Sequence, residues 1–207
     1  GYLKFDFVGG IDRRVVIGKK VYVGDNAVPG VMGIKAFHLV EAGERDRIPK
    51  VKEMYIDIGA ASREEAEEKI NIGDVGCFDP SVVEFGEGWL KAKAIDDRIG
   101  CAIMIKMAEK LKDVEIDNDI YYCFAVQEEV GTRGSKPASF AIDPDCGIAF
   151  DVTGTGDTSG ARPMAVKLGG GAAIKLKDAS VICDRALVEK MKSTANENGI
   201  KYQLEIL

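Results

Sequence analysis

Carboxylate side chains stand directly after three predicted strands. They are Asp96 and Asp97 after residues 91–95, Glu128 and Glu129 after residues 120–126, and Asp151 after residues 146–150. In an open α/β sheet, ligands gather at the carboxyl ends of the strands. Acidic side chains brought to one sheet edge would repel one another unless a cation lay among them. The pattern therefore favours a divalent metal site.

The pair Glu128 and Glu129 is the strongest local signal. A pair of glutamates usually marks a solvent-exposed strand end, but this pair follows the mostly apolar stretch 120–126, which predicts a central strand. Burying both carboxylates there without a positive partner would cost on the order of several kcal/mol. In a metal hydrolase, one glutamate binds a metal ion while its neighbour holds the attacking water and takes its proton.

The other two acidic positions have competing explanations. Asp96 or Asp97 alone would be better explained as the N-cap of the helix predicted over residues 97–112, but two in a row exceed what capping requires. One can cap while the other points into a site. Asp151 precedes a Gly- and Thr-rich stretch, 153–160, that could cradle phosphate. That stretch lacks the G-x-x-x-x-G-K-[ST] pattern, so nucleotide binding is the weaker interpretation.

Other catalytic classes have less support. His38 is the only histidine and lies far in sequence from the carboxylates, and no G-x-S-x-G is present, so a serine or cysteine triad has little basis. A carbohydrate hydrolase could use two carboxylates without a metal. A non-catalytic assembly protein would need no metal at all.

Composition limits the partners. The net charge is −6, and no Lys/Arg cluster outweighs the acids around it, so we expect no nucleic-acid partner. No apolar run approaches the roughly 20 residues that span a bilayer, and no basic-then-apolar leader opens the sequence, so we expect no membrane partner. The five dispersed cysteines suit reduced core thiols in a cytoplasmic protein.

The elements fall into two regions. Residues 1–88 predict a β-rich domain because short apolar stretches alternate with turn signals, and Ser62 with Glu65 forms a capping box for a short helix through Lys69. The strands expected there are 3–8, 19–23, 28–35, 54–58 and 75–78, with bends at Gly30 and Gly33.

The stretch 86–88 is the expected boundary, and residues 89–207 alternate strands with helices in an α/β pattern. Besides the elements above, we expect helices over 135–141 and 184–198 and strands over 172–176 and 202–206. The chain opens on Gly1 and stops directly after the last of these, so we expect it to be part of a longer polypeptide.

Together these stretches resemble a specific family: the dinuclear metallo-aminopeptidases of peptidase family 42, also called TET or glutamyl-aminopeptidase-like enzymes. Some members carry the names cellulase or endoglucanase. The matching stretches are FVGGID at 7–12, GVMG at 30–33 with His38-Leu39, YIDIGA at 55–60, KAIDDRIG at 93–100, VQEEVGTRG at 126–134 and FDVT at 150–153. The resemblance covers essentially the whole chain.

The resemblance implies an α/β catalytic domain, a zinc-exopeptidase-like (phosphopeptidase-like) three-layer sandwich, with a small inserted β-barrel domain for oligomer contacts. Asp96 would bridge two divalent metal ions, zinc or cobalt, about 3.5–4 Å apart. Asp97 would support it, Glu128 would be the general base, and Glu129 and Asp151 would each bind one metal. The implied reaction releases N-terminal residues from peptides by a metal-bound hydroxide. The resemblance also implies self-association, as a dodecamer.

Two metal-binding histidines of the family have no counterpart here. The first lies in a G-H-x-D segment upstream of what is Gly1, the second beyond Leu207 after a Gly-Gly-Thr-Asp stretch, and His38 matches neither. Imidazole suits zinc better than carboxylate alone. We therefore expect the parent protein to be a competent peptidase and the 207-residue segment by itself to be inactive or metal-poor.

Overall fold

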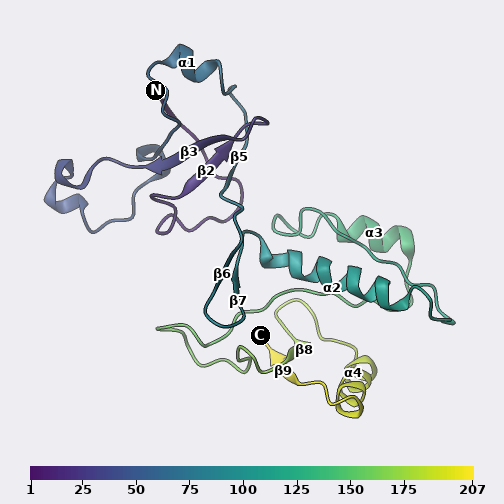
Figure 1. The fold of residues 1–207 in the computed structure, drawn as a ribbon. Coiled ribbons are helices and arrows are strands. Elements are labelled where there is room, and N and C mark those ends of the chain that lie inside the picture. Colours follow the sequence, from purple (N-terminus) through teal and green to yellow (C-terminus); the bar gives the residue numbers. More distant parts are fainter. The chain divides into compact units, whose positions relative to one another are not determined.

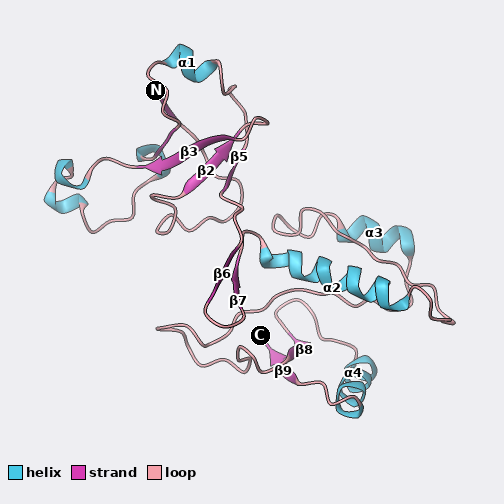
Figure 2. Ribbon diagram, viewed as in Figure 1, coloured by secondary structure: helices cyan, strands magenta, loops and turns pink.

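The computed structural model describes residues 1–207, without the side chain of Ala42. The chain forms two compact units, each built from two stretches of sequence. Figures 1 and 2 show the helices and strands that these stretches contain. The first unit comprises Gly1–Ile95 and Leu111–Gly147, and the second comprises Asp96–Lys110 and Ile148–Leu207. Both units contain helices and strands, so the chain is of mixed α/β type.

A five-stranded antiparallel sheet organises the first unit, with the order β1-β4-β3-β2-β5. Its strands are β1 (Tyr2–Leu3), β2 (Lys20–Val23), β3 (Val28–Gly33), β4 (Tyr55–Asp57) and β5 (Gly76–Phe78). The first strand is much shorter than the one predicted over residues 3–8. The other four lie where the alternating apolar pattern predicted them, because that pattern reports which face of a strand is buried.

The two glycines of β3 do not interrupt the strand. The pairing of β3 with β4 runs without interruption from Val31 to Gly33. A Cβ on Gly30 would lie 2.7 Å from Ile56 Cγ2, and one on Gly33 would lie 2.5 Å from the Tyr55 ring. Glycine is needed here because side chains of β4 lie across β3. Bends at these two positions stay a prediction.

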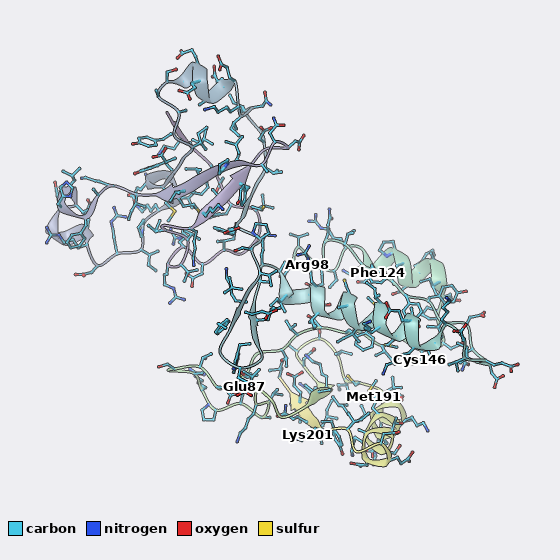
Figure 3. All side chains as sticks on the ribbon, in the orientation of Figure 1. Glu87, Arg98, Phe124, Cys146, Met191 and Lys201 are labelled. Carbon is cyan, nitrogen blue, oxygen red and sulfur yellow. The ribbon has the colours of Figure 1, made fainter. Side chains whose placement is uncertain are left out.

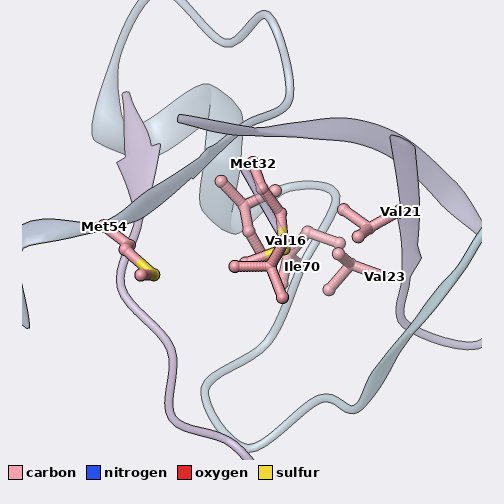
Figure 4. Packing of buried hydrophobic residues seen from close by; sticks show 7 residues of the cluster. Val16, Val21, Val23, Met32, Met54 and Ile70 are labelled. Atoms are coloured by element: carbon pink, nitrogen blue, oxygen red, sulfur yellow. The ribbon is translucent and has the colours of Figure 1, made fainter. Parts of the chain in front are cut away.

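The core of the first unit lies against this sheet. Its buried residues are Val16, Val21, Val23, Met32, Met54, Ile56 and Ile70. Figure 4 shows Val16, Met32 and Ile70 directed toward one another, with Val21 and Val23 beside them. Val21 and Val23 alternate with more exposed neighbours along β2, which is the period of a half-buried strand.

Truncating Met54 should lower the free energy of unfolding of the first unit more than truncating an exposed apolar residue does. Met54 is 0% exposed, so Met54→Ala leaves a cavity and should lower the free energy of unfolding by about 2–5 kcal/mol. Ile72 is 96% exposed, and Ile72→Ala should change it by less than about 0.5 kcal/mol. Urea titrations of both variants measure the difference, and equal midpoints would show that Met54 is not a core residue.

Ser62 caps helix α1 (Arg63–Glu67), as predicted, but the return bond of the predicted capping box reaches Ala61 instead of Ser62, and the helix stops before Lys69. Ser62 Oγ accepts a hydrogen bond from the Glu65 N–H at 3.2 Å, and the Glu65 carboxylate accepts one from the Ala61 N–H at 2.9 Å. Three short 3-10 helices precede it: η1 (Phe37–Leu39), η2 (Ala42–Glu44) and η3 (Val51–Glu53).

The glycines expected at a domain boundary form the turn of a hairpin. Strands β6 (Val83–Phe85) and β7 (Trp89–Lys91) pair antiparallel on either side of residues 86–88, and the Phe85 and Trp89 rings stack. Gly86 and Gly88 have φ of 57° and 75°, which suits a tight turn. The division of the chain at residue 88 stays a prediction.

Three predicted strands of the α/β region are not formed. Of the strand predicted over 91–95, Lys91 is the last residue of β7 and Ile95 is already the first residue of helix α2 (Ile95–Leu111). Residues 120–126 and 146–150 have no strand pairing in the described part of the chain, and both stretches are largely exposed, with Phe124 and Cys146 labelled on them in Figure 3. Their apolar composition predicted strands that the structure does not contain. A strand also needs a hydrogen-bonding neighbour, which composition does not supply.

The second unit contains a parallel strand–helix–strand arrangement. Strand β8 (Ala172–Lys177) pairs in parallel with β9 (Tyr202–Ile206), and helix α4 (Arg185–Glu197) connects them and contacts β8. Asp184 Oδ1 accepts from the Leu187 N–H at 2.8 Å and caps α4, and Gly199 has φ of 63° at its end. All three elements were predicted within one or two residues.

Helix α2 (Ile95–Leu111) is present, but its predicted burial on a sheet is not found, since Gly100 is its buried residue. The five cysteines are free, and the expectation of core thiols was wrong because three are exposed and two are half-buried. Within the described residues, the helices lack the length and apolar content needed to cross a bilayer.

Candidate functional site

The first acidic pair lies at the start of α2. Asp96 and Asp97 depart from helical geometry, with ψ of 109° and 51°, and the peptide bond that joins them is cis. Asp97 Oδ1 accepts the Gly100 N–H at 3.0 Å, so Asp97 caps the continuous part of the helix. Asp96 is exposed and has no hydrogen bond or ion pair among the described residues. One aspartate thus caps the helix, as the sequence suggested, and the other is free to bind a ligand.

Gly100 makes room for this cap. A Cβ on Gly100 would lie 2.3 Å from Asp97 Oδ2, so any larger residue would push the carboxylate off the first turn of the helix. The glycine four residues after Asp96 is therefore part of the same arrangement as the two aspartates.

The second acidic pair lies on a closed loop before helix α3 (Ser135–Ile142). The Glu128 carbonyl accepts the N–H groups of Gly131 and Thr132, both at 2.9 Å, and the Val126 carbonyl accepts the Gly134 N–H at 2.9 Å. These bonds fix the backbone that carries Glu128 and Glu129. Both side chains are exposed and unpaired in the part of the chain that the structure describes.

Glycine closes this loop, as predicted for the residues that flank the glutamates. A Cβ on Gly134 would lie 2.6 Å from both the N and the O atom of Val126. Gly131 has φ of 113°, a conformation that other residues rarely adopt. The two ends of the loop can meet only because position 134 has no side chain.

Asp151 lies on an exposed loop segment of the second unit. Its Oδ1 accepts the Val152 N–H at 2.7 Å. Two residues further on, the Thr153 hydroxyl donates a hydrogen bond to the carboxylate of Glu205 in β9. The Thr153 backbone is therefore tied to the β8–β9 sheet, and Asp151 stands next to that attachment.

The compact units divide the predicted site residues between them. Asp96, Asp97 and Asp151 belong to the second unit, and Glu128 and Glu129 belong to the first. The described residues contain no group of three or more His, Cys, Asp or Glu side chains that could hold a metal ion. His38 lies in η1 and is exposed. The convergence of the acids at one place stays a prediction.

The donor chemistry of these residues nevertheless fits a divalent cation. Carboxylate oxygens are ligands for zinc and for harder divalent ions. Asp96, Glu128 and Glu129 have no cationic side chain within salt-bridge distance among the described residues, so their charge is not already neutralised by the chain. The Asp97 carboxylate, by contrast, already accepts the Gly100 N–H and caps the helix.

Sequence reasoning missed one residue of this region, Glu205. It is 2% exposed, the single charged residue among the buried ones that the structure describes. The signal was present in the predicted strand 202–206, where a glutamate alternates with Leu204 and Ile206. An acidic residue on one face of a short strand can be exposed to solvent, or it can be buried with hydrogen-bonding partners. The sequence pattern is the same in both cases, and only the fold distinguishes them.

The chain matches a known protein family over its full length. The family model described as M42 glutamyl aminopeptidase matches residues 1–207. A putative aminopeptidase of Acetivibrio thermocellus is 48% identical over 207 residues, which are 100% of this chain and 60% of that protein. The lysyl aminopeptidase of Pyrococcus furiosus is 33% identical over 211 residues, 100% of this chain and 58% of that protein.

A solved structure is also similar. The TET aminopeptidase of a marine-sediment Thaumarchaeota archaeon superposes with a TM-score of 0.92 at 34% identity, over 100% of this chain and 60% of that one. The chain thus spans about three fifths of the length of the proteins that it matches.

Proposed function

The chain belongs to the M42 glutamyl aminopeptidase family, and we propose that the full-length protein removes N-terminal residues from peptides with the help of two divalent metal ions. The observation that supports this most is the family match over residues 1–207, which includes every acidic residue singled out by its position after a predicted strand. The similarity to named aminopeptidases and to a TET aminopeptidase structure supports the same reaction class.

We assign the metal-binding roles as follows. Asp96 would be shared by the two ions, and Glu129 and Asp151 would each hold one of them. Asp97 supports Asp96 from the neighbouring position, because its hydrogen bond to the Gly100 N–H anchors it to the helix. When bound, such ions polarise a carbonyl oxygen and make a water molecule more acidic. Zinc and cobalt are the candidates, and histidines outside residues 1–207 would complete the ligands.

Glu128 is the general base of the proposal. It would take a proton from the attacking water and pass it to the amine that leaves when the peptide bond breaks. Its backbone is fixed, since its carbonyl accepts two N–H groups of the loop. A side chain on a fixed backbone is held near the orientation that proton transfer needs. Glu129, the next residue, is then free for the metal.

The remaining features of the proposal concern architecture and location. The catalytic domain would be completed as a three-layer sandwich, and residues 1–88 would form a barrel domain that mediates oligomer contacts, in a dodecamer or a similar shell. The TET relationship supports self-association. A cytoplasmic location is supported by five free cysteines.

Removal of metal tests the reaction class. Dialysis of the full-length protein against a chelator should lower the release of 4-nitroaniline from a panel of aminoacyl-4-nitroanilides by at least about 100-fold, because the carbonyl and the water would lose their activation. Added zinc or cobalt should restore the rate. Hydrolysis of a β-glucan that persists after chelation, without peptidase activity, would instead support a metal-free glycosidase.

A further inference from the structure

The sheet of the second unit has one face with polar side chains. In β8 and β9, Ile174 pairs with Leu204, and Lys175 pairs with Glu205. Because side chains alternate along a strand, Lys175 and Glu205 share one face of the sheet. Gln203, two residues before Glu205, lies on that face as well. Three polar side chains of the short sheet, Lys175, Gln203 and Glu205, thus lie on one face.

Glu205 is buried and fully engaged on this face. Its side chain is 3% exposed, its Oε2 lies 3.4 Å from Lys175 Nζ, and its other oxygen accepts the Thr153 hydroxyl. Lys175 also lies 3.3 Å from Asp178. Burial opposes the charge of Lys175, but the hydrogen bond to Asp178 and the charge of Glu205 outweigh it and raise the pKa of Lys175. Lys175 is therefore held in its protonated form.

Gln203 holds the far end of the segment that begins at Thr153. Its side-chain carbonyl accepts the Lys167 N–H at 2.8 Å, and its amide donates to the carbonyls of Lys167 at 2.9 Å and Gly171 at 3.0 Å. A Cβ on Gly170 would lie 2.4 Å from the Gln203 side chain. Two side chains of β9 thus fasten both ends of the segment 153–171 to the sheet.

A purely stabilising role explains this arrangement poorly. Replacement of a buried ion pair by apolar residues is often neutral or stabilising, so burial of Glu205 is weak evidence for a contribution to stability. What the carboxylate does specifically is accept the hydroxyl of Thr153, two residues after Asp151. Asp151 has no other attachment among the described residues than the bond to its own neighbouring N–H.

We propose that Glu205 is a positioning residue for Asp151: its hydrogen bond to Thr153 fixes the backbone beside Asp151 and so directs that carboxylate toward a divalent ion. The proposal rests on the metal-binding role of Asp151 in the proposed function. Residues that hydrogen-bond to a metal ligand or to its backbone contribute strongly to metal affinity. They restrict the ligand to the orientation that binds the metal, so less conformational entropy is lost on binding.

The experiment compares four variants of the full-length protein. Thr153→Val removes the donor hydroxyl at nearly constant shape, and Glu205→Ala removes the acceptor. Glu205→Gln keeps an acceptor oxygen for Thr153 and serves as the conservative replacement. Val188→Ala is the matched control, because Val188 is buried in α4 of the same unit and lies in the helix rather than in the polar network.

Hydrogen–deuterium exchange without metal is the first measurement. Thr153→Val and Glu205→Ala should speed exchange of the amides near Asp151 by about tenfold, since a hydrogen bond to a charged acceptor is lost. Glu205→Gln should retain most of the protection. Protection equal to the wild type in both disruptive variants, or equal loss in Val188→Ala, would overturn the proposal.

Titration with Co²⁺ is the second measurement. Thr153→Val and Glu205→Ala should weaken binding at one of the two sites by about tenfold, while Val188→Ala binds as the wild type does. Unchanged Co²⁺ affinity in both disruptive variants would also overturn the proposal. A wild-type protein that binds no Co²⁺ would contradict the metal-binding role of Asp151. If amide exchange near Asp151 were nevertheless faster in Thr153→Val and Glu205→Ala, Glu205 would still be shown to order this segment.

Discussion

Glu128→Gln in the full-length protein should lower kcat for peptide hydrolysis by about 10²–10⁴, the range that a general base contributes. The amide is nearly the same size as the carboxylate but cannot take a proton from water. Because Glu128 is not assigned as a metal ligand, the metal content and KM should stay close to those of the wild type. Steady-state kinetics and metal analysis of the purified variant measure these quantities together.

The neighbouring residue supplies the matched control. Glu129→Gln makes the same chemical change one position further along the same fixed loop, but it should lower metal content first and activity as a consequence. Excess metal should therefore rescue Glu129→Gln in part and leave Glu128→Gln unchanged. The opposite result, with metal lost from Glu128→Gln and retained in Glu129→Gln, would exchange the two roles.

Gly134→Ala should displace the loop that carries both glutamates and lower kcat/KM by about 10–100-fold, because small misplacements of catalytic groups are costly. Gly134 has φ of −78° and ψ of −35°, which alanine adopts without strain. The whole effect therefore arises from the added methyl group, which would meet the Val126 backbone at 2.6 Å. The loss of stability should be about 1–3 kcal/mol, as in other overpacked sites.

Gly147 provides the comparison. A Cβ there would have no atom within 4 Å, and Gly147 belongs to the same compact unit. Gly147→Ala should leave kcat/KM and the urea midpoint unchanged. If Gly134→Ala were as active as Gly147→Ala, the closure of the loop at Val126 would have no bearing on catalysis.

Local signals predicted the helices well. The cap at Asp184 and the stop at Gly199 placed α4 within a residue, and Ser62 with Glu65 placed the start of α1. These signals work because the groups that start and end a helix lie within a few residues of one another. A cap by one of Asp96 and Asp97 was predicted for the same reason, and the structure shows that it is Asp97.

Features that depend on distant partners were predicted less well. The stretch around Phe124 has strand composition but no strand pairing in the structure, because pairing depends on a neighbour elsewhere in the chain. Glu205 was not singled out, because the residue whose hydroxyl it accepts, Thr153, is far away in sequence. The glycines of β3 were assigned to bends for a similar reason, because Ile56 and Tyr55, which require them, lie on another strand.

The exposed stretch 120–126 around Phe124 has a practical consequence. Tyr121 is 64% exposed and Val126 is 68% exposed, so the polypeptide presents apolar side chains on a stretch that has no strand pairing. Uncharged segments with strand-forming composition can pair with other chains when exposed, which favours aggregation. A sample of residues 1–207 alone should therefore be most soluble at low concentration or when fused to a solubility-enhancing carrier.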